Sequence, residues 1–160
     1  MKFLFTGFWL IVPILIWNAI FYSRLPAQYQ PEIFDQDIHP FVLYGENIFR
    51  VLIFGLPLLF SIGLSAKTQQ IGLALYLVGS LIYILSWLPL IFVPDCTWST
   101  SLIGFAAPAY TPILWLIGIV LMGDNFYFLI EYKPLYYLIP AVIFSVFHCT
   151  HAVIAYLQNF

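Results

Sequence analysis

Charged side chains are scarce in this sequence, which has 5 basic and 7 acidic residues among 160, or 8% of the chain. Soluble domains average about 25%, so these charges are too few to cover the surface of a water-soluble globule. Intrinsic disorder is excluded as well, because disordered chains combine low hydrophobicity with high net charge. The formal net charge of −2 also provides no basic surface for nucleic acid.

Common motifs of soluble enzymes are missing too. The sequence contains no Walker loop, no G-x-G-x-x-G and no G-x-S-x-G, which weakens an ATPase or an α/β-hydrolase interpretation. No internal repeat is visible, and we expect a single domain over residues 1–160. Only two cysteines are present, Cys96 and Cys149. A disulfide between them is allowed in an oxidising compartment, but a buried free thiol is the better interpretation for Cys149.

Apolar residues, in contrast, make up 63% of the chain and gather in long uncharged runs. A membrane core of about 30 Å requires about 20 residues of apolar helix. Four runs reach this length, and a fifth does so if it extends back through Arg50 and Glu46 towards Pro40. None alternates as a transmembrane β-strand would. The sequence therefore predicts an all-α integral membrane protein, a bundle of five transmembrane helices, with approximate spans 3–22, 41–66, 71–93, 102–122 and 135–157.

Basic residues in the connections indicate the orientation of this bundle. Lys2, Lys67 and Lys133 fall on one side of the membrane, and Arg24 falls on the other. The side richer in Lys and Arg is normally cytoplasmic, which predicts a cytoplasmic N-terminus and an outside C-terminus in a bacterial-type plasma membrane. The short turn at 67–70 further predicts that the second and third helices form an antiparallel hairpin.

Polar residues within the spans are predicted to lie at one depth. At a rise of about 1.5 Å per residue, their distances from the helix ends place these side chains in the outer half of the bundle. Polar groups in hydrocarbon are costly and therefore indicate function, so the layer predicts a polar pocket that opens towards the outer face. Its members are Asn18, Glu46, Asn47, Arg50, Ser86, Trp87, Tyr110, Thr111, His148 and His151.

Glu46 and Arg50 form the first notable pair in this layer. They are four residues apart, which places both side chains on the same face of a helix and favours an ion pair. The pair could line the pocket, join two helices, or lie at the membrane interface with Arg50 extended towards water. Asn47 is adjacent and could extend the network.

His148 and His151 form the second pair, three residues apart on one helix. This spacing allows both imidazoles to bind one metal ion, with Glu46 as a third ligand and Asp95 or His39 as a fourth. Imidazole and carboxylate ligands suit zinc, iron or copper. Hydrogen bonding within the bundle is the leading interpretation of the two histidines, followed by contact with an organic ligand or a proton path.

Prolines interrupt the fourth span, where Pro108 and Pro112 flank Tyr110 and Thr111. Each proline frees a backbone carbonyl, which a membrane protein tolerates where neighbours or a cavity satisfy it. The segment is therefore expected to be a kinked packing helix or a kink that opens a ligand cavity. Trp9, Trp17, Trp87 and Trp115 lie deep in their spans, where aromatic rings either fill the core or line a site for a flat or long apolar ligand.

Three functions are compatible with this pattern. The leading one is binding or transport of a lipid-like or other apolar small molecule, and the alternatives are a membrane-embedded metal-dependent enzyme acting on a lipidic substrate and an accessory subunit of a membrane complex. The expected partners are membrane lipid and a second membrane subunit or another copy of the chain. The expected ligand-binding residues are Glu46, Asn47, Arg50, Tyr110, His148 and His151.

Overall fold

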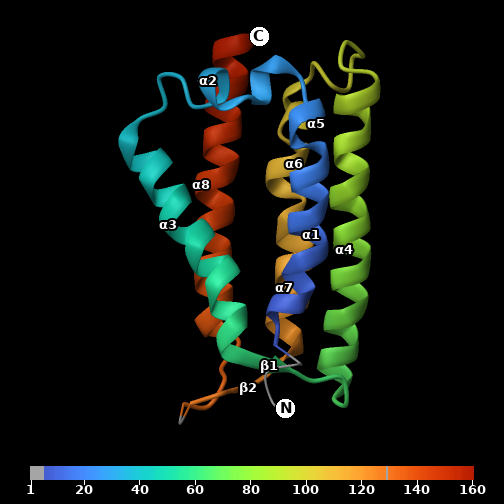
Figure 1. Cartoon of the computed structure of the whole chain (residues 1–160), viewed down its shortest axis with the longest axis vertical. Coiled ribbons are helices and arrows are strands. Elements are labelled where there is room, and N and C mark those ends of the chain that lie inside the picture. Colours follow the sequence, from blue (N-terminus) through green and yellow to red (C-terminus); the bar gives the residue numbers. More distant parts are fainter. Residues whose placement is uncertain (1–5, 129) are drawn as a thin grey trace.

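The computed structural model describes residues 6–128 and 130–160, and most of them are helical (Figure 1). The main helical segments run along one long axis, and the connections lie at its two ends. They are α1 (Phe8–Phe21), α3 (Pro40–Gly55), α4 (Lys67–Phe92), α5 (Leu102–Phe105), α6 (Ala107–Tyr110), α7 (Pro112–Met122) and α8 (Leu135–Asn159). The shorter elements are η2 (Tyr22–Arg24), η3 (Ala27–Tyr29), α2 (Pro31–Phe34), η4 (Leu56–Leu59), β1 (Phe60–Ile62) and β2 (Gly123–Phe126).

Three helical segments are long and apolar enough to cross a membrane, namely Pro40–Leu59, Lys67–Phe92 and Leu135–Asn159. Two further apolar segments, Phe8–Arg24 and Ala107–Met122, are shorter. The first expected span, 3–22, begins in residues that lie outside the described part of the chain. A mostly helical protein with helices suited to a membrane is therefore confirmed, and the count of five spans stays a prediction.

The second expected span ends earlier than the sequence indicated. The α-helix gives way to η4 at Leu56, and Phe60–Ile62 form a strand that pairs antiparallel with β2. Pro57 cannot donate a backbone hydrogen bond to continue the α-helical pattern, and strand pairing satisfies the backbone groups that follow. Residues 60–66 therefore lie across one end of the bundle instead of completing the span 41–66 (Figure 1).

The predicted hairpin of the second and third helices is wrong. Helix α4 packs mainly on α7, and α3 packs mainly on α8, so α3 and α4 lie on opposite sides of the bundle (Figure 1). The non-helical residues 60–66 connect the two helices. Seven extended residues reach about 20 Å, so α3 and α4 need not be neighbours. Residues 67–70, which were expected to form a turn, are the first turn of α4.

Helices α4 and α7 approach closely because glycines face each other between them. A Cβ atom on Gly79 would lie 2.5 Å from the backbone nitrogen of Trp115, and one on Gly118 would lie 2.5 Å from that of Tyr76. A Cβ atom on Gly72 would lie 2.8 Å from the carbonyl oxygen of Gly118. These distances leave no space for a side chain, as is typical of small-residue contacts between membrane helices. The seam fixes Trp115 against α4.

The fourth expected span is broken into α5, α6 and α7, as its prolines predicted. Pro108 and Pro112 stand in the first turns of α6 and α7, where the missing N–H is tolerated. The hydroxyl of Thr111 donates to the carbonyl oxygen of Ala107 at 2.7 Å and so satisfies an acceptor in the irregular stretch. Pro108, Ala109 and Pro112 line a cavity between the helices.

Candidate functional site

A half-open cavity of about 570 Å³ lies between the helices, next to the connection from α1 to α3. Its volume is within the range of small-molecule sites, roughly 300–1,000 Å³. Residues of α1, α3, α4, α6, α7 and α8 line it, and most of the lining is apolar or aromatic. The aromatic lining residues are Tyr22, Tyr29, Phe34, Phe54, Tyr83, Trp87, Phe105, Trp115 and Phe144.

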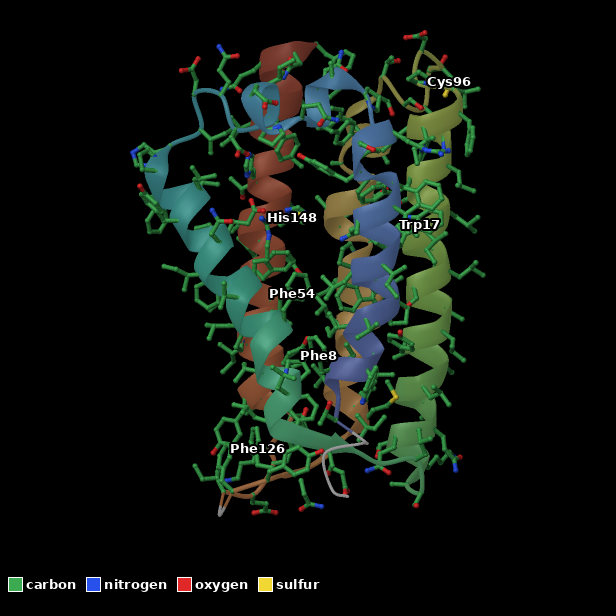
Figure 2. The ribbon with its side chains drawn as sticks, viewed as in Figure 1. Phe8, Trp17, Phe54, Cys96, Phe126 and His148 are labelled. Atoms are coloured by element: carbon green, nitrogen blue, oxygen red, sulfur yellow. The ribbon has the colours of Figure 1, made fainter. Side chains whose placement is uncertain are left out.

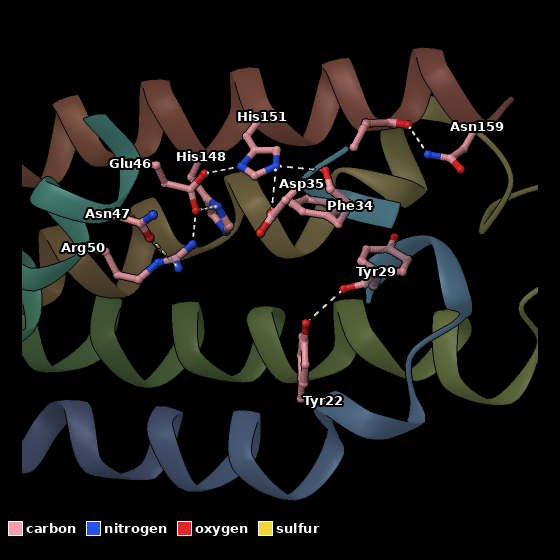
Figure 3. Close-up of polar contacts among 11 residues, drawn as sticks. Tyr22, Tyr29, Phe34, Asp35, Glu46, Asn47, Arg50, His148, His151 and Asn159 are labelled. Atoms are coloured by element: carbon pink, nitrogen blue, oxygen red, sulfur yellow. Dashed lines mark hydrogen bonds and ion pairs between the residues drawn. The ribbon is translucent and has the colours of Figure 1, made fainter. Parts of the chain in front are cut away.

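A buried carboxyl group organises the polar side of this cavity. Glu46 of α3 is 1% exposed and forms an ion pair with Arg50, one helical turn further on. From α8, Nδ1 of His148 lies 3.0 Å from Oε1 of Glu46, and Nδ1 of His151 lies 2.6 Å from Oε2 (Figure 3). The network joins α3 to α8, and each carboxyl oxygen has at least one partner.

The contacts of His151 fix how many protons the pair of Glu46 and His151 holds. Nε2 of His151 lies 3.0 Å from the carbonyl oxygen of Phe34, which can only accept, so Nε2 carries a hydrogen atom. Nδ1 faces a carboxyl oxygen, so one further proton must lie between these two atoms. It is donated either by an imidazolium to a carboxylate or by a carboxylic acid to a neutral ring. In both descriptions the pair has no net charge.

Two charged groups at the edge of the cavity balance each other. Arg50 is 42% exposed at its side chain, and it also donates to Oδ1 of Asn47 at 3.2 Å. Asp35 is 44% exposed at its side chain, and its Oδ1 lies 3.4 Å from Nε2 of His151. With His148 in its neutral form, the ionisable groups on this side of the cavity therefore sum to zero charge.

His148 presents one unassigned ring nitrogen. The neutral ring donates its Nδ1–H to Oε1 of Glu46, an oxygen that also accepts from Arg50, so Nε2 keeps a lone pair. His148 lines the cavity and stacks on Phe144 with ring centroids 5.1 Å apart. A histidine oriented in this way by a carboxyl group can accept a hydrogen bond from a ligand or take a proton from it.

The structure brings most of the expected ligand-binding residues together. Arg50, His148 and His151 line the cavity, and Glu46 lies behind them. Tyr110 is 38% exposed and does not line the cavity. Its neighbours Ala109 and Pro112 do. The five expected residues that share one network are Glu46, Asn47, Arg50, His148 and His151.

The metal site expected from Glu46, His148 and His151 has its donor atoms in contact with one another. Two ligand atoms on one tetrahedral zinc ion stand about 3.4 Å apart and point at the metal. Here both Nδ1 atoms form hydrogen bonds directly with the carboxyl group. Within residues 6–128 and 130–160, no group of three or more His, Cys, Asp or Glu side chains is arranged to hold a metal ion.

Neither expected fourth ligand reaches this cluster. His39 instead begins α3, where its Nδ1 accepts a hydrogen bond from the backbone N–H of Phe41. The acidic residue that contacts His151 is Asp35, which no pattern in the sequence distinguished from the other acidic residues nearby. Cys96 lies at the end of the bundle that carries the C-terminus, and both cysteines are free thiols in the described structure (Figure 2).

A stacked ring pair closes the cavity towards the connections. The rings of Tyr29 and Phe105 lie 4.5 Å apart, and the Tyr29 hydroxyl donates to the carbonyl oxygen of Phe105 at 2.7 Å. The hydroxyl of Tyr22 donates to the carbonyl oxygen of Tyr29 at 3.2 Å (Figure 3). Burial raises the pKa of Tyr29 above its ordinary value, so this hydroxyl stays a donor at neutral pH. The pair separates the cavity from a smaller pocket of about 200 Å³ that shares both rings.

The wall formed by α4 and α7 carries Tyr83, which sequence reasoning missed, and Trp115. Tyr83 donates its hydroxyl to Oδ1 of Asn18 at 2.6 Å and meets the ring of Trp115 at 6.5 Å. Trp115 is 2% exposed, and its indole N–H has no hydrogen-bond partner in the described structure. The sequence placed Trp115 deep in its span, but hydropathy alone cannot distinguish a packing tryptophan from one that lines a cavity.

Comparisons with protein-family models, with curated proteins and with solved structures gave no match to this chain. A fold-level likeness would in any case be weaker ground than the chemistry of named residues.

Proposed function

We propose that this chain is a membrane-embedded protein that binds or transports a lipid-like small molecule. One observation carries the proposal: the 570 Å³ cavity is largely apolar, and its charged groups gather on one side. An amphipathic molecule would bury its apolar body against the aromatic wall of α4 and α7. Its polar head would then meet Arg50 and His148, which Glu46 holds in place.

The same proposal includes five membrane spans with the N-terminus in the cytoplasm and the C-terminus outside. Helix α1 and the broken segment from α5 to α7 run alongside the three long helices, which supports two additional crossings (Figure 1). The orientation follows the distribution of Lys and Arg in the connections. The cavity would then lie nearer the outer face, in a bacterial-type plasma membrane.

A blocked-cavity variant tests the proposed binding. Ala152 lines the cavity and is 2% exposed, so Ala152→Trp would fill part of the space. Leu81→Trp adds a similar ring at an outward-facing position that is 56% exposed and serves as the control. We expect wild type and Leu81→Trp to retain a lipophilic molecule through purification, detected by mass spectrometry of organic extracts. Ala152→Trp, if folded by circular dichroism, should lose it, and equal retention by all three would contradict the proposal.

A membrane-embedded enzyme is the second candidate, because the carboxyl group of Glu46 orients His148 in the way that a general base is oriented. Its metal-dependent form requires the carboxyl–imidazole contacts to open around an ion. Near-stoichiometric zinc, iron or copper in wild type, lost in His148→Ala/His151→Ala, would favour this enzyme. Folded wild type without metal would favour binding alone. An accessory subunit, by contrast, would fail to remain folded when purified without its partner.

A further inference from the structure

His148 presents a ring nitrogen without a partner. Its Nδ1 lies 3.0 Å from Oε1 of Glu46, whereas its Nε2 has no hydrogen-bond partner among the described residues. Packing does not close off this nitrogen, because the His148 side chain is 22% exposed and contributes none of the polar atoms that are both buried and unpaired in the described structure. A molecule the size of water therefore reaches Nε2.

The exposed part of the His148 ring faces the cavity and not the outer surface of α8. His148 lies one helical turn after Phe144 and one turn before Ala152, and all three residues line the cavity. Phe144 is 5% exposed and Ala152 is 2% exposed, whereas Val146, on the outward face, is 60% exposed. Residues one turn apart share a helix face, so the open side of the ring is the side that the cavity reaches.

Nε2 of His148 is a hydrogen-bond acceptor. The proton that Glu46 shares with His151 lies at Oε2, so Oε1 carries no hydrogen atom and accepts from its neighbours. Those neighbours are Arg50 and Nδ1 of His148. A second proton on His148 would place two cations at one carboxyl oxygen, which is unfavourable away from water. The ring is therefore neutral, and a group that binds Nε2 must donate a hydrogen atom to it.

Arg50 provides donors next to this acceptor. Arg50 lines the cavity, and its hydrogen bonds with Asn47 and Glu46 leave further N–H groups of the guanidinium unused in the described structure. Arg50 and His148 contact the same carboxyl oxygen, so the two side chains lie next to each other (Figure 3). A hydroxyl group both donates and accepts at one oxygen atom, so it suits this pair of neighbours.

The charges on this side of the cavity restrict the ligand further. The pair of Glu46 and His151 is neutral overall, and Arg50 and Asp35 balance each other. A charged donor, such as an ammonium group, would enter this apolar space without a counter-charge, which is unfavourable. We infer that the ligand is an uncharged lipophilic alcohol or phenol whose hydroxyl group donates a hydrogen bond to Nε2 of His148. This inference rests on the proposed binding function and adds the chemical class of the head group.

Three small probes separate shape from hydrogen bonding and from charge. 2-Hydroxyfluorene and 2-fluorofluorene share one flat ring system, and fluorine is close to a hydroxyl group in size but cannot donate. Fluorene-2-carboxylate carries a negative charge at the same position. Each probe is dialysed to equilibrium against protein in nanodiscs at neutral pH, and binding to empty nanodiscs is subtracted. We expect 2-hydroxyfluorene to bind about two- to tenfold more tightly than 2-fluorofluorene, as one neutral hydrogen bond allows, and more tightly than the carboxylate.

Two histidine variants assign this preference to one acceptor. In His148→Asn the amide nitrogen takes the place of Nδ1 and can still donate to Glu46, but no atom stands at the place of Nε2. The preference for 2-hydroxyfluorene over 2-fluorofluorene should therefore disappear. His39→Asn is the matched control, because His39 caps the start of α3 and does not line the cavity. Asparagine is also a good N-cap residue, so this variant should fold and keep the full preference.

The outcomes distinguish the inference from the function on which it rests. Equal binding of 2-hydroxyfluorene and 2-fluorofluorene to wild type, a preference that survives in His148→Asn, or tighter binding of the carboxylate would each overturn the inference and leave the binding function standing. Failure of all three probes to bind above empty nanodiscs would overturn the proposed function as well. If His148→Asn does not fold, the ranking of the three probes on wild type still decides.

Discussion

Replacing Glu46 separates the two possible roles of its carboxyl group, hydrogen bonding and charge. Glu46→Gln keeps the shape of the side chain. The glutamine oxygen can accept from Arg50 and His148, and its amide can donate to Nδ1 of His151. That nitrogen is then a free acceptor, because the hydrogen on Nε2 is already used by the carbonyl of Phe34. We therefore expect Glu46→Gln to fold.

Glu46→Ala removes every one of these contacts. Nδ1 of His151, in a side chain that is 2% exposed, would have no partner, and His148 would lose its orienting acceptor. Arg50 is half-exposed and can turn towards water, so the loss of its contact with Glu46 lowers the stability only a little. Breaking a buried charged network costs about 3–5 kcal/mol, whereas exchanging a charged for a neutral acceptor costs about 1 kcal/mol.

Thermal unfolding in detergent, followed by circular dichroism, measures the difference. At about 2–4 °C per kcal/mol, Glu46→Ala should lower Tm by about 6–20 °C and Glu46→Gln by less than about 5 °C. Glu32→Gln removes the same charge from an exposed position and should leave Tm unchanged. A Glu46→Gln variant as unstable as Glu46→Ala would refute the hydrogen-bond argument. A harmless Glu46→Ala would show that the network does not hold α3 to α8.

Three further predictions concern the helix seam, the thiol of Cys96 and the proposed orientation. Gly79→Ala and Gly118→Ala should each lower the free energy of unfolding by about 1–3 kcal/mol, because the added Cβ atom would overlap with the facing helix. Gly55→Ala is the control and should have no such effect, since a Cβ atom there meets nothing within 4 Å among the described residues. Equal Tm values for all three variants would refute the close contact between α4 and α7. Hydrogen bonds with Ser99 hold the pKa of the Cys96 thiol below its usual value, so more thiolate is present at a given pH. The rate of maleimide labelling should therefore reach half its maximum below pH 9. In Ser99→Ala this midpoint should move to a higher pH. Labelling of Cys96 in intact cells by a membrane-impermeant maleimide would support the proposed orientation, and labelling only after lysis would reverse it.

The polar network was largely predictable because its chemistry follows short-range rules. Glu46 and Arg50 are one helical turn apart, His148 and His151 are three residues apart, and both pairs count to the same depth. Charged groups at such a depth need partners, and few other polar side chains lie at the same depth in the sequence. The arrangement of the helices relative to one another was not fixed by these rules, and Tyr110 counted to the same depth yet faces away from the cavity.

The features that were missed depend on tertiary contacts between distant segments. Strand β1 forms because residues 123–126 lie beside it, which no local pattern in residues 60–62 indicates. The contact of Asp35 with His151 depends on how the connection folds over the end of α8. Trp115 becomes part of a cavity wall only because Gly79 lets α4 and α7 approach, and glycine spacing alone does not identify the partner helix.

The position of the cavity follows from the way in which the helices pair. Glycines hold α4 to α7, and the Glu46 network holds α3 to α8. Pro108 and Pro112 prevent residues 102–122 from forming one straight helix that would fill the space. A polar network inside a membrane persists only if its members satisfy one another across helices, so the contacts that stabilise α3 on α8 also place Arg50 and His148 at the cavity. The same residues therefore serve both stability and the proposed recognition of a polar head group, which is why Glu46→Gln, with its hydrogen bonds preserved, is the informative substitution for both.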